Sequence, residues 1–395
     1  MAPTIYSATH GRQSAPSAHL DAMRGLAAII VLAFHARLLF FVDRADVTPD
    51  MYSVFATVFY LATAFGREAV LAFFVLSGFL IAGSIHRDHM AGRWSAGRYA
   101  IARLSRLYVV LLPALALGLA WDILGLRLFP AAAVYHGTLA NSAFPFDVTA
   151  RLGVGNIFGT LGFVQSIVVA PPGSSEQFWS LAYEFWCYAL FPLIYIALAG
   201  ASWLWQRLAA SAAVVAIAWC LGADVFAYFG CWLAGAAVAL LPVSLQTRLR
   251  RYVIALVVAG LAVVALALYS IKAYGLRMPE SGFVLAISFA LLIASIASSE
   301  SSQRLRAIGQ CYGAVSHWLA QRSFSLYAIH LPVLVFLRAW CGDTLWQPTL
   351  ANIGLWLATV VACVVYADLV WRLAERHTPA VRRWLLLRIY ERANS

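Results

Sequence analysis

Apolar residues along this chain form long, nearly uninterrupted stretches, and polar residues gather between them. A helix needs about 20 mainly apolar residues to cross a bilayer. The stretches of suitable length are residues 23–42, 66–84, 107–128, 179–199, 205–222, 225–241, 251–270, 281–298, 323–341 and 350–372. The pattern therefore predicts an all-α polytopic membrane protein with about ten transmembrane helices.

The same pattern divides the chain into three parts. Residues 1–22 are polar and mixed, which predicts an N-terminal tail. The apolar run that begins at Met23 is too long for the core of a cleavable signal peptide, so we expect it to remain as the first helix. Residues 23–372 then form the transmembrane domain, and residues 373–395 form a basic tail.

Four shorter segments have their own predicted roles. Residues 51–65 are apolar but too short to span, which favours a helix at the outer lip of the membrane. Residues 129–178 carry clusters of glycine, proline and serine and are long enough for a structured lid or a re-entrant loop. Residues 303–321, and the tail over residues 376–392, mix arginines with apolar residues. Both are typical of amphipathic helices that lie among lipid headgroups.

Composition supports a membrane location. Only 11% of the residues are charged, whereas a soluble domain carries about 25%. So little charge cannot cover a surface in water, so lipid must cover most of this one. The six cysteines are scattered without a CxxC pair, which indicates packing residues and predicts neither a metal site nor a disulfide framework.

The net charge of +11 comes from 27 arginines and one lysine, set against 17 acidic residues. If the N-terminus is cytoplasmic, 20 of these 28 basic residues fall on cytoplasmic segments and only seven on outer ones. The positive-inside rule describes this asymmetry, so we expect both termini to be cytoplasmic. Because the arginines flank apolar helices, the lipid bilayer is the predicted partner and nucleic acid is not.

Among the ionisable residues inside the predicted spans four stand out, namely His35, Asp122, Glu184 and His330. Such groups are costly in a bilayer unless they are paired or face a polar cavity, so each is a functional candidate. Helical rise puts the first three about 8–10 Å below the outer surface, on three different helices. Asp122 could also be an ordinary interfacial carboxylate. His330 could be either a structural histidine or one that contacts a ligand.

Arginine spacing adds a second constraint. Arg24 precedes His35 by eleven residues, which puts the two side chains about 16 Å apart on nearly the same helical face. Arg103 and Arg106 are three residues apart and so point to one side of their helix. They form a fork suited to phosphate oxygens, although an anchor at the membrane surface explains them as well.

Five stretches resemble, in order, the motifs of the acyltransferase-3 family of integral membrane acyltransferases, and the resemblance runs from about residue 19 to 380. The stretches are HLDAMRGLAAIIVLAFH, FFVLSGFLI, RLSRLY, FWSLAYEFWCY and SFSLYAIHLP. The resemblance implies a ten-helix core, an acyl-CoA donor and O-acetylation of lipopolysaccharide, exopolysaccharide, peptidoglycan or small glycosides. It also implies a multi-pass protein of the bacterial cytoplasmic (inner) membrane.

The motifs transfer to this chain residue by residue. The catalytic candidates are His35, Glu184 and Arg24. The acyl-CoA-binding candidates are Arg103, Arg106, Ser325, Tyr327 and His330. The possible acceptor-side residues are Trp179 and Ser180 of the FWSLAYEFWCY stretch, together with Asp122, which its depth in the membrane suggests. No metal and no tightly bound cofactor are expected, and acetyl-CoA enters as a substrate.

The resulting hypothesis is transfer of acetyl from cytoplasmic acetyl-CoA to a hydroxyl of an extracytoplasmic saccharide or glycolipid. His35 would act as general base or be transiently acylated, and Glu184 would orient its imidazole. A proton-coupled secondary transporter explains buried charges as well, but the sequence shows no internal repeat. A structural scaffold leaves the buried ionisable groups without a role.

Overall fold

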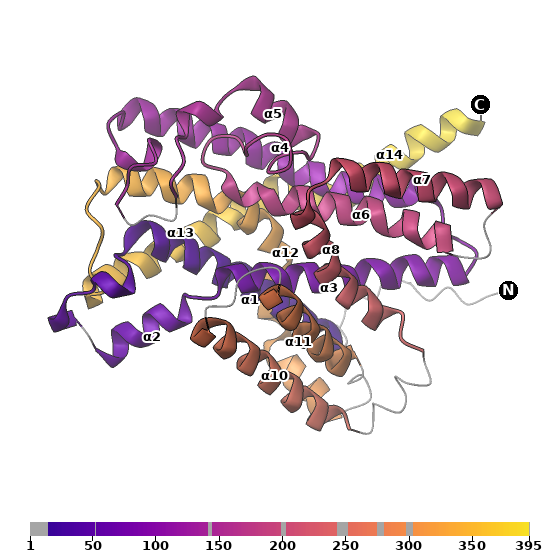
Figure 1. Cartoon of the computed structure of the whole chain (residues 1–395), viewed down its shortest axis with the longest axis horizontal. Coiled ribbons are helices and arrows are strands. Elements are labelled where there is room, and N and C mark those ends of the chain that lie inside the picture. The colour runs from indigo at the N-terminus through magenta and orange to yellow at the C-terminus, as the bar shows by residue number, and fades with distance from the viewer. Residues whose placement is uncertain are drawn as a thin grey trace.

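Helices account for nearly all the regular structure in the computed structural model, which describes residues 15–51, 53–140, 144–198, 203–242, 252–274, 280–297 and 303–394. The α-helices are α1 Ala15–Phe40, α2 Val54–Ala62, α3 Gly66–Met90, α4 Ala96–Leu128, α5 Val154–Leu161, α6 Trp179–Leu198, α7 Leu204–Cys220, α8 Ala223–Ala239, α10 Val253–Tyr274, α11 Glu280–Ala297, α12 Gln303–Trp340, α13 Leu350–Leu373 and α14 Thr378–Asn394. Several of the longest helices run along the long axis of the molecule, and α14 projects at the end opposite α2 (Figure 1).

Each of the ten predicted spans falls on a helix, which confirms the all-helical class. Among the described residues, six helical segments are long and apolar enough to cross a membrane: Ala18–Phe40, Val54–Met90, Ala96–Leu128, Glu176–Leu198, Ala307–Trp340 and Leu350–Ile389. The other four predicted spans correspond to the shorter apolar helices Leu204–Cys220, Ala223–Ala239, Ile254–Ser270 and Ser281–Ala297. Ten crossings and cytoplasmic termini therefore stay predictions.

The two predicted helices at residues 303–321 and 323–341 are one continuous helix, α12. The sequence pattern predicted them as separate segments, with Arg322 between them. In the structure, Arg322 is 6% exposed and forms an ion pair with Asp368 of α13, and its guanidinium lies 4.3 Å from the ring centroid of Trp318. A charge paired inside the bundle needs no break in the helix. The first half of α12 keeps exposed apolar side chains such as Val315, at 63%, and its headgroup location stays a prediction.

The remaining short segments keep their helical character. Within residues 51–65 the structure forms α2, whose N-terminus is capped by the Ser53 side chain through a 3.1 Å bond from the Ala56 amide. The basic tail forms α14, on which Trp384 is 57% exposed. All six cysteines are free thiols. The headgroup location of α14 stays a prediction.

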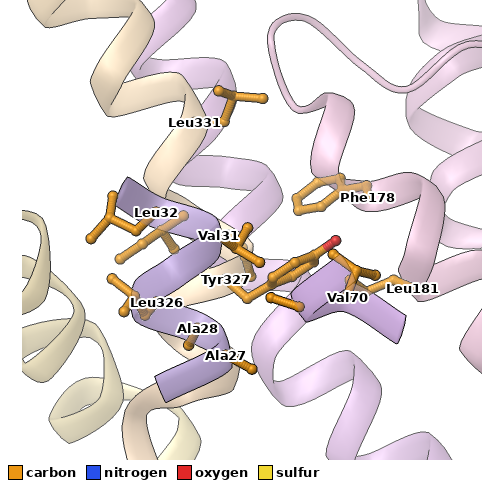
Figure 2. Close-up of a cluster of buried hydrophobic side chains, with 14 of the residues drawn as sticks. Ala27, Ala28, Val31, Leu32, Val70, Phe178, Leu181, Leu326, Tyr327 and Leu331 are labelled. Atoms are coloured by element: carbon orange, nitrogen blue, oxygen red, sulfur yellow. The ribbon is translucent and has the colours of Figure 1, made fainter. Parts of the chain in front are cut away.

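Glycines bring helix backbones close together in the core. A Cβ at Gly78 of α3 would lie 1.9 Å from the Trp232 carbonyl oxygen, and one at Gly235 of α8 would lie 1.8 Å from that of Val75. Helices within membranes associate largely through such small-residue contacts. On α1, Gly25 likewise leaves room for Leu319 of α12. Figure 2 shows small residues of α1 facing the large apolar side chains of α12.

Prolines inside two helices leave carbonyls unbonded, and side chains from other elements bind them. Proline has no N–H, so the carbonyl four residues earlier loses its helical partner. For Pro192 in α6 that carbonyl belongs to Tyr188, and it accepts the Tyr99 hydroxyl at 2.9 Å. For Pro332 in α12 it belongs to Ala328, and it accepts the Gln177 amide at 2.7 Å. Apolar surroundings make these replacement bonds necessary.

The long segment predicted to lie outside the membrane, called the outer segment and described over residues 129–140 and 144–178, is structured and held against α4. Asp122 is fully buried and accepts bonds from the Ser174 amide at 2.8 Å and the Ser174 hydroxyl at 2.6 Å. Within the segment, Arg151 forms an ion pair with Glu176. Asp122 was a candidate for the acceptor side, but the structure uses both its carboxylate oxygens to hold this segment.

The proline at residue 192 makes the Tyr99 hydrogen bond testable. We expect Tyr99→Phe to lower the free energy of unfolding by about 1–3 kcal/mol, because the Tyr188 carbonyl loses its donor. In a Pro192→Ala background the residue 192 amide can bond this carbonyl, so the same change should cost less than about 1 kcal/mol. Reversible unfolding in mixed micelles measures both, with Tyr269→Phe on the exposed surface of α10 as the control. An equal cost in both backgrounds would contradict this role for Tyr99.

Candidate functional site

A cavity of about 280 Å³ lies within the bundle, walled by α1, α3, α4, α6 and α12. Eight of its eighteen lining residues are apolar, and the other ten carry polar or ionisable side chains. The polar and ionisable lining residues are Arg24, Ser77, Ser84, Arg103, Arg106, Ser180, Glu184, Tyr188, Ser323 and Tyr327. Enclosed space with a few converging polar groups is the usual form of a small-molecule site.

Three arginines define one end of this cavity, which we call the arginine end. Arg103 lies over the rings of Tyr99 and Tyr188, at 5.7 and 5.9 Å from their centroids, and Arg106 lies 5.7 Å from the centroid of Phe324. The Nε atoms of Arg24 and Arg103 are buried without a hydrogen-bond partner among the described residues. The predicted fork of Arg103 and Arg106 lines the cavity together with Arg24, so the guanidinium groups can meet an anion bound there.

Glu375 supplies an opposing charge at the arginine end. It lies in the short 3-10 helix η7, Glu375–His377, and accepts bonds from the Ser325 amide at 3.1 Å and the Ser325 hydroxyl at 2.6 Å. The charges of Arg106 and Arg24 act on its carboxylate. Sequence analysis missed Glu375 because it stands in the basic tail, and only the turn after α13 returns it to the bundle. Ser325, an expected donor contact, is occupied by Glu375 and does not line the cavity.

Arg24 is also positioned by its own helix. Asp21, one turn earlier on α1, lies 3.3 Å from the Arg24 guanidinium and 3.0 Å from His317 of α12. An acidic residue three positions before an arginine can pair with it on a helix surface. The pairing orients the Arg24 side chain, which lines the cavity.

Glu184 lies in the cavity wall among hydroxyl groups. It accepts hydrogen bonds from Ser77 of α3, at 3.4 Å, and from Tyr188, one turn later on α6. Ser77 in turn accepts the Trp232 indole N–H at 3.3 Å. These bonds orient the carboxylate of Glu184 toward α3. Both hydrogen-bond donors that it accepts from are hydroxyl groups. The expected pairing of Glu184 with His35 is not observed.

Tyr327 closes the cavity at the end nearer the two histidines. Its hydroxyl bonds Ser180 at 2.6 Å and donates to the Gln177 carbonyl at 3.2 Å. Its ring centroid lies 6.0 Å from that of His330. Figure 2 shows the ring projecting from α12 toward Leu181. Tyr327 therefore borders the cavity on one side and the histidines on the other. It was expected among the acyl-CoA-binding residues.

His35 of α1 and His330 of α12 form a pair. The His35 Nδ1 lies 2.9 Å from the His330 Nε2, and the rings are stacked with centroids 5.1 Å apart. His330 is 1% exposed, and its Nδ1 lies 3.1 Å from the Leu326 carbonyl oxygen and 2.8 Å from that of Tyr327. Neither histidine is among the residues that line the cavity.

The pairing differs from the sequence hypothesis for a geometric reason. Helical rise places His35 and Glu184 at a similar depth, but depth does not determine which way a helix is turned about its axis. The helix α1 packs along α12, so the imidazole meets His330, which was expected to contact the donor. The structure thus replaces an imidazole–carboxylate pair with an imidazole–imidazole pair.

The predicted acceptor-side residues separate into three environments. Ser180 lines the cavity beside Tyr327. Trp179 belongs to an aromatic cluster, with its ring centroid 4.9 Å from Tyr228 and 6.3 Å from Phe74. Asp122 fastens the outer segment. Only Ser180 of the three is placed to meet a molecule in this cavity.

Comparison with known proteins agrees with the motifs. A family model described as an acyltransferase domain, that of the acyltransferase-3 family, matches residues 17–372 and so covers nearly the whole chain. No curated protein matches the chain, and no solved structure matches it.

The arginine end predicts a measurable affinity for anions, which Glu375 opposes. We expect Glu375→Gln to bind inorganic pyrophosphate about three- to tenfold more tightly, because a carboxylate no longer competes for Arg24 and Arg106. Titration calorimetry on the detergent-solubilised protein measures this. Glu176→Gln, which removes the same charge from the ion pair with Arg151 in the outer segment, is the control. Unchanged or weaker binding in Glu375→Gln would refute the competition.

Proposed function

The chain belongs to the acyltransferase-3 family, and from that premise we propose that it transfers an acetyl group from acetyl-CoA to a saccharide hydroxyl across the membrane. The observation that carries this proposal is a cavity with three arginines at one end and, beyond Tyr327 at the other, a pair of imidazoles. Anion recognition and a general base are the two requirements of transfer from a charged thioester. Family membership favours this reaction over the transporter alternative.

The donor would enter at the arginine end. Its phosphates would bind Arg24, Arg103 and Arg106, whose guanidinium donors suit phosphate oxygens. The cavity volume, about 280 Å³, is near the lower limit for ligand pockets, about 300 Å³. It therefore suits the slender acyl-bearing arm of the donor, with the nucleotide part remaining at the mouth. The excess of arginine at predicted inner segments supports a cytoplasmic location for this end.

The reaction would use His35 as general base. The acceptor hydroxyl oxygen attacks the thioester carbonyl carbon while its proton passes to the His35 imidazole. The tetrahedral intermediate then collapses, the C–S bond breaks, and the thiolate takes the proton from the imidazolium. The hydroxyls of Ser180 and Tyr327 bond each other in the cavity wall, and either would exchange its present bond to the Gln177 carbonyl for one to the thioester oxygen.

Glu184 would serve the donor in this scheme. Its carboxylate faces the cavity, so it can accept hydrogen bonds from N–H groups of the acyl-bearing arm. The acceptor would be a lipopolysaccharide O-antigen, an exopolysaccharide or a glycolipid, as the family resemblance implies, reached from the outer side. An acyl-His35 intermediate is the other chemistry open to the same imidazole, and it needs the same unprotonated nitrogen.

Loss of His35 tests the proposed base. We expect His35→Ala to reduce the transfer rate by about 10²–10⁴-fold, because a positioned base contributes about that factor. Transfer of labelled acetyl from acetyl-CoA to surface polysaccharide, normalised to inserted protein, measures it. His86→Ala removes another partly buried helical histidine and should retain normal activity. Near-normal transfer by His35→Ala would remove His35 from the reaction.

Loss of Arg106 tests the donor end. We expect Arg106→Gln to raise the KM for acetyl-CoA about tenfold with little change in kcat, because phosphate binding is lost and the reacting groups are untouched. Steady-state kinetics in proteoliposomes measure both constants. Arg127→Gln, an exposed change at the other end of α4, is the control. A fall in kcat with an unchanged KM would contradict a donor-binding role.

A further inference from the structure

We infer that His330 is a positioning residue that holds His35 in the one tautomer able to act as a base toward the acceptor. This inference rests on the proposed function of His35. It assigns to His330, which was expected to contact the donor, a different role that acts through its partner imidazole. The argument follows the positions of the protons through the two rings.

The first proton is located by the backbone of α12. His330 Nδ1 lies 2.8 Å from the Tyr327 carbonyl oxygen and 3.1 Å from the Leu326 carbonyl oxygen. Both are acceptors, and a carbonyl oxygen has a second lone pair besides the one used in the helix. A nitrogen lone pair facing two carbonyl oxygens would be repelled, so Nδ1 must carry a hydrogen. In a neutral ring, Nε2 of His330 then carries the lone pair.

The second proton follows from the first. The His330 Nε2 lone pair faces His35 Nδ1 at 2.9 Å, so His35 Nδ1 must carry the hydrogen of this bond. A neutral His35 then has its lone pair on Nε2, the nitrogen that points away from His330. Which nitrogen bears the proton is set by the hydrogen bond that the other nitrogen makes. Two carbonyls of α12 thus act on the tautomer of an imidazole on α1, whose ring also hydrogen-bonds the Val31 carbonyl of its own helix.

The position of His330 is itself rigid. The residue is 1% exposed and lies two residues before Pro332, and the preceding Ala328 carbonyl is held by Gln177. The Tyr327 side chain is held by Ser180 on the opposite side. These contacts surround His330 along one turn of α12, so its ring has little freedom to turn away from His35.

A neutral acceptor suits this apolar position better than a carboxylate does. In a serine-protease triad a buried aspartate holds the histidine tautomer, and removing that acceptor costs about 10⁴ in kcat. A buried carboxylate in a helix bundle would need its own counter-charge. His330 supplies the same acceptor without a charge, and its bond to His35 strengthens when His35 becomes an imidazolium.

The test compares two substitutions of similar size. His330→Leu removes the acceptor, and we expect kcat to fall about 10²–10⁴-fold with an unchanged KM for acetyl-CoA. In His330→Gln the amide oxygen takes the place of Nε2, so kcat should be at least about tenfold higher than in His330→Leu. His35→Ala and His35→Ala/His330→Leu should have the same residual rate, because residues acting as a unit are not additive. His86→Leu is the matched control.

A direct readout is 15N NMR of the histidine-labelled protein. The chain has nine histidines, so the signals of His35 and His330 are assigned by their loss in the single variants. We expect His35 to be protonated at Nδ1 alone in the wild type and to become a mixture of tautomers in His330→Leu. This measurement uses the wild-type protein, so it decides the matter even if His330→Leu does not fold.

The outcomes separate the two proposals. If His35→Ala is inactive while His330→Leu keeps its kcat within about threefold, the role of His330 is refuted and the proposed function stands. If His35→Ala remains active, the proposed function fails, whatever the tautomer. A wild-type His35 protonated at Nε2, or a His330→Leu variant that changes only the donor KM and the stability, also overturns the inference.

Discussion

Polar groups in this bundle depend on hydrogen-bond partners from within the protein, since neither lipid nor apolar side chains can supply them. The carbonyls left unbonded by two prolines are held by Tyr99 and Gln177. The buried carboxylate of Asp122 is held by Ser174. Each of these bonds joins segments distant in sequence. Supplying a buried polar group with a hydrogen-bond partner therefore also determines how the helices and the outer segment are placed.

The candidate site is built from the same bonds. Tyr188 offers its carbonyl to Tyr99 and its hydroxyl to Glu184, so one residue links a proline-containing helix to the cavity wall. Gln177 bonds the Ala328 carbonyl through its side chain and accepts the Tyr327 hydroxyl through its own carbonyl. Structural and functional contacts are therefore not separable here, and changes to either set should affect the other.

Charge is distributed unevenly along the cavity. The arginine end carries three guanidinium groups, opposed by the carboxylates of Glu375 and Asp21, whereas the other end holds the two imidazoles of His35 and His330. A charged end attracts an anionic donor, and a neutral end avoids the cost of burying an unpaired charge. Tyr327 stands between the two, which separates binding of the donor from the base that would act on the acceptor.

The sequence alone determined the helical class and the approximate position of each helix, because a helix that crosses a bilayer needs an apolar run of matching length. It also placed Arg103 and Arg106 on one side, since a spacing of three residues determines direction on a helix. The partner of His35 was decided only by tertiary structure. Rotation of a helix about its axis depends on packing against its neighbours, and no local spacing records it. For the same reason Glu375, brought back by a turn after α13, became visible only in the folded chain.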